Sequence, residues 1–315
     1  MDDNDADYKS KLQACDVLIC NKHLSDDAYK VCLDAKKLNK FVLYDIDDWI
    51  FEFPSYTEVS DQKYSKFKQD PIQRQKTVSR FLDLADQITV SNAELHRSVG
   101  EKSYKNILVP NGIWVEKYIK HSDFKPNLNL SNKFRILFVN ADNLKLNAGK
   151  KGFISAVKRF QEENKSSEFI YIGDNVDELG EIPRLSAYAR MDYVTFMHKI
   201  SKLNIDFAVV PLAGSEDPED FKFNIAKSPF KYLNYGCVGI PAIYSQGTIY
   251  DDLIFNERNG ILCTNTMESW SRALLKITDP NIRAKIARES FYDVRKNHHI
   301  SAAADVLEKI FMQSN

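Results

Sequence analysis

The chain alternates short apolar runs with helix-like stretches, and the whole pattern occurs twice. This alternation favours parallel sheets, because parallel neighbouring strands need a crossover helix between them. The expected strands are Asp16–Cys20, Phe41–Tyr44, Gln87–Val90, Ile107–Val109, Arg135–Val139, Glu168–Ile172, Asp206–Pro211 and Pro241–Tyr244. The expected helices are Asp26–Leu38, Arg74–Ala85, Phe153–Glu163, Tyr193–Leu203, Pro229–Tyr235, Glu268–Ile277 and Ile282–Asn297. We therefore predict an α/β protein with two doubly wound sheets that face each other across a cleft.

The boundary between the two halves is expected in a polar stretch, His121–Lys133, which contains Pro126 and several asparagines. Such a stretch buries little and is typical of a linker. The predicted domains are residues 1–125 and residues 126–315. A chain of 315 residues with 43% hydrophobic residues is long enough to form two cores of ordinary size.

The charges of the chain nearly cancel. Lysine and arginine number 43 against 44 aspartates and glutamates, a net charge of -1, so no nucleic-acid partner is expected. No apolar run approaches the roughly 18 residues that cross a bilayer, and the acidic N-terminus differs from a signal peptide. We expect a cytoplasmic protein and leave open a peripheral association with the inner face of the membrane.

Signals for metal or nucleophilic chemistry are thin. The five cysteines are dispersed and have no C-x-x-C spacing, so they are expected to be reduced thiols. The sequence has no H-E-x-x-H motif and no Cys/His spacing for a metal, and it lacks the G-x-S-x-G elbow of serine hydrolases. It also lacks G-x-G-x-x-G, which weakens an assignment as a nicotinamide enzyme. No metal site is predicted.

The segment Phe223–Gln246 combines a helix start with a following strand. Ser228 is expected to be the N-cap and Pro229 the first helical residue, so that free N–H groups point forward and favour an anion such as phosphate. Lys227 and Lys231 add positive charge on either side. An ordinary αβ unit with a well-capped helix is the alternative.

A second basic loop, KLNAGKKG from Lys145 to Gly152, precedes the helix expected near Phe153. Its glycines allow close approach of the backbone, and Lys150 or Lys151 can neutralise a diphosphate. The order of glycines and lysine does not match a P-loop, which argues against an ATPase. A solvated loop without a ligand is the alternative.

The sharpest acidic cluster is YDIDDW, Tyr44–Trp49, which places Asp45, Asp47 and Asp48 directly after an apolar strand. Such carboxylates can hold a divalent metal, as in D-x-D sugar transferases, or supply the nucleophile of a haloacid-dehalogenase-like phosphatase. They can also bind sugar hydroxyls or act as a base without a metal. A helix cap without any chemistry is the fourth alternative.

Polar residues follow most of the expected strands. Ligands of open parallel sheets bind beyond the carboxyl ends of the strands, so these residues are candidates for one binding edge. In the first half they include Ser91, Asn92, Asn111 and Gly112. Loops are polar in most α/β proteins, so part of this enrichment needs no ligand.

The motifs occur in an order that resembles a known family. They are VLYDIDDWIFEFP (42–54), ADQITVSNAEL (85–95), ILVPNGI (107–113), RILFVNADN with GKKGF (135–153), FIYIGD (169–174), IDFAVVPL (205–212), FNIAKSPFKYLNYGCVGIPAIYS (223–245) and ERNGILC (257–263). This order is similar to that of GT-B glycosyltransferases of family four, which are retaining enzymes, and the match spans most of the chain from about Asp16 onward.

The resemblance implies two Rossmann-like domains and an enzyme that moves a sugar from a nucleotide sugar to a cell-surface glycan or a lipid-linked precursor. The nucleotide sugar would be a co-substrate, and neither a metal nor another cofactor would be needed. The donor-binding residues, in the second domain, would be Lys145, Lys151, Gly152, Asn224, Lys227, Ser228, Lys231 and Asn234. The acceptor would lie near Ser91, Asn92, Asn111 and Gly112, with Asp45, Asp47 and Asp48 as the catalytic candidates.

Two departures from the family keep other readings open. Ala226 and Asn234 stand where members carry a pair of glutamates, so a catalytically silent module that partners an active transferase is the alternative, and a D-x-D metal-dependent transferase or a phosphatase is a further one. The first domain also lacks the usual opening strand and glycine-rich loop. We therefore expect a reduced first domain, a fragment, or a chain that uses a partner's surface.

Overall fold

The computed structural model describes residues 7–52, 71–103, 105–120, 123–126, 133–142, 150–174, 179–180, 182–213 and 221–312. The chain forms two compact units. Unit 1 comprises Met1–Asn111, Ile225–Ser228 and Ser301–Asn315, and unit 2 comprises Gly112–Asn224 and Pro229–Ile300.

Unit 1 is built on a four-stranded parallel sheet whose order is β1-β2-β3-β4, the order of the sequence. The strands are β1 (Val17–Asn21), β2 (Phe41–Ile46), β3 (Gln87–Val90) and β4 (Asn106–Leu108). The helices are α1 (Tyr8–Ala14), α2 (Asp26–Lys37), α4 (Pro71–Leu84) and α5 (Ala93–Gly100).

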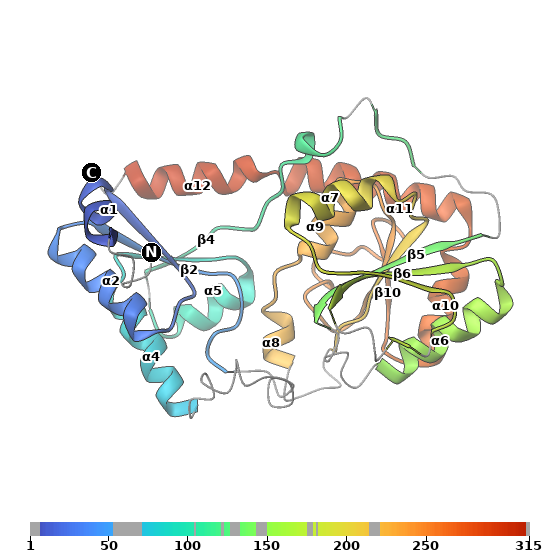
Figure 1. Cartoon of the computed structure of the whole chain (residues 1–315), viewed down its shortest axis with the longest axis horizontal. Coiled ribbons are helices and arrows are strands. Elements are labelled where there is room, and N and C mark those ends of the chain that lie inside the picture. Colours follow the sequence, from blue (N-terminus) through green and yellow to red (C-terminus); the bar gives the residue numbers. More distant parts are fainter. Residues whose placement is uncertain are drawn as a thin grey trace. The chain divides into compact units, whose positions relative to one another are not determined.

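The crossover helices of unit 1 lie on one side of its sheet. Right-handed crossovers between strands in sequence order place their helices on the same face, and Figure 1 shows α2, α4 and α5 in this arrangement. Tyr44 of β2 stacks on Phe81 of α4 with ring centroids 5.1 Å apart, and Tyr29 of α2 packs edge-on against Phe81 at 5.3 Å. These aromatic contacts fix the helical layer on the sheet.

Unit 2 holds a six-stranded parallel sheet of order β10-β9-β8-β5-β6-β7. The strands are β5 (Arg135–Asp142), β6 (Glu168–Asp174), β7 (Leu185–Tyr188), β8 (Phe207–Val210), β9 (Ala242–Ser245) and β10 (Ile261–Cys263). The helices are η2 (Val115–Lys117), α6 (Lys150–Glu163), α7 (Tyr193–Lys202), α8 (Phe221–Ile225), α9 (Phe230–Cys237), α10 (Met267–Lys276) and α11 (Pro280–Asn297), and α12 (Ile300–Met312) begins at the last residue of this unit.

Helices cover both faces of the sheet in unit 2. Figure 1 shows α6 and α10 on one face and α7, α9 and α11 on the other. Each face of the sheet has its own hydrophobic core. In one core Trp270 of α10 packs edge-on against Phe153 of α6, with ring centroids 5.1 Å apart, and the other core contains Phe291 of α11 and Tyr232 of α9. The order of the strands reverses at β5, which has β6 on one side and β8 on the other. The carboxyl ends of β5 and β8 therefore form the topological switch point of this sheet.

The domains at residues 1–125 and 126–315 stay a prediction beside the two compact units of the structure. The change between units falls between Asn111 and Gly112, and the residues after Ile300 return to unit 1. The four buried cysteines and the half-buried Cys15 are free thiols, as predicted. None of the helices within the described ranges combines the length and the apolar composition that a bilayer crossing requires.

Candidate functional site

The first polar group of unit 1 is a row of side chains across three strands. Asp45 lies inside β2 rather than after it, because the strand continues to Ile46. Asn21 and Thr89 are its register partners on β1 and β3. Asn21 Nδ2 donates to one carboxylate oxygen of Asp45 at 2.7 Å, and Thr89 Oγ1 donates to the other at 2.7 Å. Both oxygens of Asp45 therefore already accept hydrogen bonds.

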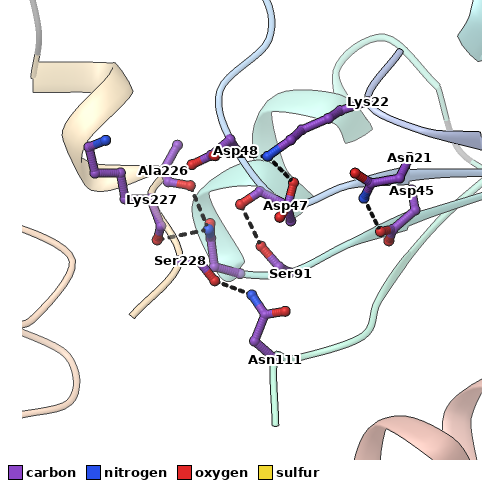
Figure 2. A network of polar contacts seen from close by, with 11 residues as sticks. Asn21, Lys22, Asp45, Asp47, Asp48, Ser91, Asn111, Ala226, Lys227 and Ser228 are labelled. Atoms are coloured by element: carbon purple, nitrogen blue, oxygen red, sulfur yellow. Dashed lines mark hydrogen bonds and ion pairs between the residues drawn. The ribbon is translucent and has the colours of Figure 1, made fainter. Parts of the chain in front are cut away.

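The other two carboxylates of the YDIDDW motif share one lysine, which Figure 2 shows between them. Lys22 Nζ lies 2.7 Å from Asp47 Oδ1 and 3.0 Å from Asp48 Oδ2. Burial lowers the pKa of Lys22, but the hydrogen bonds and charges of the two aspartates outweigh it and leave the pKa raised. Lys22 follows directly after β1, and nothing local in the sequence pairs it with a turn more than twenty residues away.

The backbone of Lys22 is held in the left-handed region, at φ 39°, where a residue with a Cβ pays a conformational cost. Its N–H donates to the carbonyl of Asp45 at 2.8 Å. The three aspartates do not converge on one point, and among the residues that the structure describes no group of three His, Cys, Asp or Glu side chains is arranged to hold a metal ion. The D-x-D pattern is thus engaged by protein donors.

Two residues after β3 join this cluster. The hydroxyl of Ser91 donates to the carbonyl of Asp47 at 3.3 Å. Asn92 is the N-cap of α5, where its Oδ1 accepts from Leu95 N at 2.9 Å. Its Nδ2 donates to the carbonyl of Ala226 at 2.8 Å and lies 3.4 Å from that of Lys227. Ser91 and Asn92 are both buried.

Asn111, after β4, reaches the same short segment, because its Nδ2 donates to the hydroxyl of Ser228. The prediction that Ser228 is the N-cap of the next helix is wrong. The helix α9 begins at Phe230, its N-cap is Pro229, and the cap makes no side-chain hydrogen bond. The Ser228 hydroxyl is engaged by Asn111 instead, a contact that the local Ser-Pro pattern cannot reveal.

Figure 2 shows that unit 1 brings together most of the residues predicted on the acidic and acceptor sides. Figure 2 labels Asp45, Asp47, Asp48, Ser91 and Asn111 beside the segment with Lys227 and Ser228, and Asn92 belongs to the same set through its hydrogen bond to the carbonyl of Ala226. We call this set the strand-end cluster. Gly112 belongs to unit 2, where a Cβ on it would lie 2.8 Å from the backbone of Ile300.

The remaining donor-side residues lie in unit 2. Asn234 is buried on α9, and its Oδ1 accepts from the hydroxyl of Tyr193 at 2.7 Å. Burial raises the pKa of Tyr193, which keeps this hydroxyl protonated as a donor. Asn224 is buried on α8, and Lys231 is half-buried on α9. Their contact with a donor stays a prediction.

The basic loop before α6 is only partly described. Lys145 lies outside the described residues, and for Lys151 only the backbone, inside α6, is described. Gly152 allows a close backbone approach, as predicted in general terms, but the neighbour is protein. A Cβ on Gly152 would lie 2.9 Å from both Asn265 O and Met267 N. This glycine lets α6 pack against the start of α10.

Sequence reasoning missed a polar network at the carboxyl ends of β8, β9 and β10. Ser245 Oγ accepts from Leu212 N at 2.9 Å and donates to Asn265 Oδ1 at 2.7 Å, and Asn265 Nδ2 donates to Leu212 O at 2.9 Å. The network fixes the chain where it leaves β8, beside the switch point. Asn265 was missed because the strand before it, β10, was not among the expected strands.

No protein-family model and no curated protein matches the chain. Solved structures do match its fold. The structure of Anabaena Alr3699/HepE in complex with UDP-glucose is 12% identical, with a TM-score of 0.66 over 98% of this chain and 81% of that one.

Two further structures give the same result. Sucrose-phosphate synthase from Thermosynechococcus elongatus is 13% identical, with a TM-score of 0.64 over 95% of this chain and 74% of that one. A glycosyltransferase from Rickettsia africae is 11% identical, with a TM-score of 0.61 over 98% of this chain and 80% of that one. At these identities the likeness shows the fold, and it confirms the predicted pair of parallel-sheet α/β units of the GT-B class.

Proposed function

We propose that the chain is a glycosyltransferase that moves a sugar from a nucleotide-sugar donor to a glycan or lipid-linked acceptor. The observation that carries the proposal is the strand order of unit 2, which reverses at β5 in a fold shared with a structure that holds UDP-glucose. Ligands of open parallel sheets bind at such a reversal, beyond the carboxyl ends of the strands. The donor diphosphate is therefore assigned to the ends of β5 and β8.

The local chemistry supports a diphosphate at this place. The helix α6 follows β5 in the chain. At the N-terminus of α6, backbone N–H groups and the helix dipole favour negative charge. The Ser245–Asn265 network fixes the exit from β8. Transfer would depend mainly on positioning and on stabilising the charge of the departing diphosphate, in a retaining reaction that needs no metal.

The test uses the purified full chain with UDP-, GDP- and CDP-sugars. We expect a thermal shift with one nucleotide class and release of that nucleotide, and the release should persist in excess chelator. Lys231→Ala should weaken nucleotide binding about tenfold, since it removes a positive charge from the start of α9, a helix of the same unit. Lys222→Ala is the matched control, because this exposed lysine lies on α8. Absence of both shift and release with every sugar nucleotide would refute the proposal.

A second candidate, a silent module that partners an active transferase, is favoured by one observation. Ala226 is fully buried, and Asn234 is bonded to Tyr193, so neither position offers a carboxylate. Nucleotide binding without release by the isolated chain, together with stimulation of a co-purified transferase, would favour this candidate. Release by the isolated chain would exclude it.

A further inference from the structure

The segment Ile225–Ser228 has an unusual set of neighbours. It begins at the last residue of α8 and ends two residues before α9, and the residues on either side of it belong to unit 2, yet its own contacts place it in unit 1. Two asparagines that follow strands of unit 1 bind it. Asn92 donates to the carbonyls of Ala226 and Lys227, and Asn111 donates to the Ser228 hydroxyl.

The amide of Asn92 has a fixed orientation. Its Oδ1 is held by Leu95 N as the N-cap of α5, so its Nδ2 must point at the two carbonyls. The side chain is buried, and only 8% of Asn92 is exposed. A buried amide with both ends engaged is costly to rearrange, because a lost partner leaves a desolvated polar group.

We propose that Asn92 is a positioning residue, which clamps the segment Ile225–Ser228 and so fixes Lys227 and Ser228. The clamp consists of Asn92 and Asn111 with the groups that they bind. Asn92 and Asn111 then hold a donor-side segment, a role different from the acceptor contact expected from the sequence. The consequence for nucleotide binding rests on the proposed function, whereas the clamp itself does not.

Asn92→Asp separates the two roles of this side chain. Aspartate is as good an N-cap as asparagine, so α5 is kept. At neutral pH, however, the introduced carboxylate faces the Ala226 and Lys227 carbonyls without a proton to donate. Burial and these carbonyls raise the pKa of the introduced carboxyl, so acidification should protonate it and restore the donor.

The primary readout is amide hydrogen exchange of residues 225–228 in the full chain without nucleotide. We expect Asn92→Asp to lower the protection of this segment about tenfold at pH 8, since a buried hydrogen bond is lost. Protection should return toward the wild-type value near pH 5. The second readout is the dissociation constant of UDP, which should rise at pH 8 and recover at pH 5.

Two controls accompany this variant. Asp192→Asn makes the converse exchange at the exposed N-cap of α7, where Asp192 accepts from Thr195 N, and it should leave residues 225–228 unchanged at both pH values. Asn111→Ala removes the other half of the clamp at a half-buried site and should also lower protection of residues 225–228. This second variant decides the matter if Asn92→Asp does not fold.

Unchanged protection in both Asn92→Asp and Asn111→Ala would overturn the clamp. So would a loss of protection in Asn92→Asp that acidification leaves unaltered, because a general disturbance of α5 has no such pH dependence. If the wild-type chain binds no UDP, the proposed function fails for this nucleotide while the exchange result still decides the clamp.

Discussion

The two parallel sheets are built from the same kinds of strand and crossover helix but differ in strand order. In unit 1 the described strands follow the order of the sequence, and the polar residues at their carboxyl ends are bonded to one another. In unit 2 the strand order reverses at β5, and helices cover both faces of the sheet. The chain therefore leaves the neighbouring strands β5 and β8 in opposite directions along the sheet. Strand order, more than the number of polar residues, therefore decides which sheet offers a binding crevice.

The comparison also shows what the polar residues at the strand ends of the two units bind. Asp47 and Asp48 pair with Lys22, and Asp45 accepts from Asn21 and Thr89. In unit 2 the buried Ser245 instead supports the backbone that borders the switch point. In unit 1 the polar side chains at the strand ends thus bind one another, whereas in unit 2 the polar network holds the backbone beside the switch point.

The largest expected effect concerns the glycines that let helices approach. Gly152→Ala should destabilise the protein by about 1–3 kcal/mol, because the added methyl meets backbone atoms of Asn265 and Met267 at 2.9 Å. Gly100→Ala in α5 of unit 1 is the matched control. Its methyl meets only the Asn106 side chain at 3.3 Å, so the change should stay within about 1 kcal/mol of wild type.

Urea unfolding of both glycine variants measures this difference directly. Equal losses of stability in the two variants would contradict the prediction that the close packing of α6 against α10 makes Gly152→Ala the more destabilising change.

A smaller effect is expected from a half-buried carboxylate of unit 2, Asp293. Asp293 accepts from the Tyr232 hydroxyl and, at 2.8 Å, from Asn297 Nδ2. Burial raises its pKa, but the hydrogen bonds of His298, Tyr232 and Asn297 outweigh this and leave the pKa below the ordinary 3.8. Asp293→Asn should therefore cost about 1–2 kcal/mol at pH 7, the value of charge-assisted hydrogen bonds in a half-buried site.

The sign of the pH dependence follows from the lowered pKa of Asp293. Its contribution is fully present above the unfolded value of 3.8 and is lost as the pH falls through the lower folded value. The stability difference between wild type and Asp293→Asn should thus shrink as the pH falls from 5 toward 3. A difference that grows between pH 5 and pH 3 would contradict this interpretation.

The smallest effect is expected in unit 1, at Lys22. The side chain of Lys22 is 37% exposed and that of Asp48 is 38% exposed, so solvent screens the ion pairs, and Lys22→Met should cost no more than about 1 kcal/mol. The raised pKa of Lys22 means that its contribution is fully present below the unfolded value of 10.5 and is lost only as the pH rises above it.

Denaturation of Lys22→Met, of Asp48→Asn and of the double variant would isolate the coupling between Lys22 and Asp48. A coupling that already changes between pH 6 and pH 9 would contradict the assignment to Lys22.

Much of the fold was predictable from periodicity alone. The predicted strand Gln87–Val90 matches β3, and the helix expected at Asp26–Leu38 matches α2, whose N-cap Ser25 accepts from Ala28 N. These elements have strong apolar patterns and local caps. The strands β7 and β10 were missed, because one lies in an irregular sequence and the other is only three residues long.

The candidate site was predictable in composition and less so in arrangement. Polar residues after strands identified Asn92 and Asn111, but their bonds to Ala226 and Ser228 join residues more than a hundred positions apart in the chain. Local propensity also placed the start of α9 at Ser228, where a tertiary hydrogen bond with Asn111 prevailed. Contacts of this kind depend on topology, which single-sequence patterns do not contain.

The most direct test of the account is a crystal structure of the full chain with UDP. We predict density for the nucleotide beyond the carboxyl ends of β5 and β8, with its diphosphate at the N-terminal end of α6. Density confined to another part of the molecule, or none at a concentration of UDP that saturates binding in solution, would contradict the assignment of the reversed sheet as the nucleotide-binding unit.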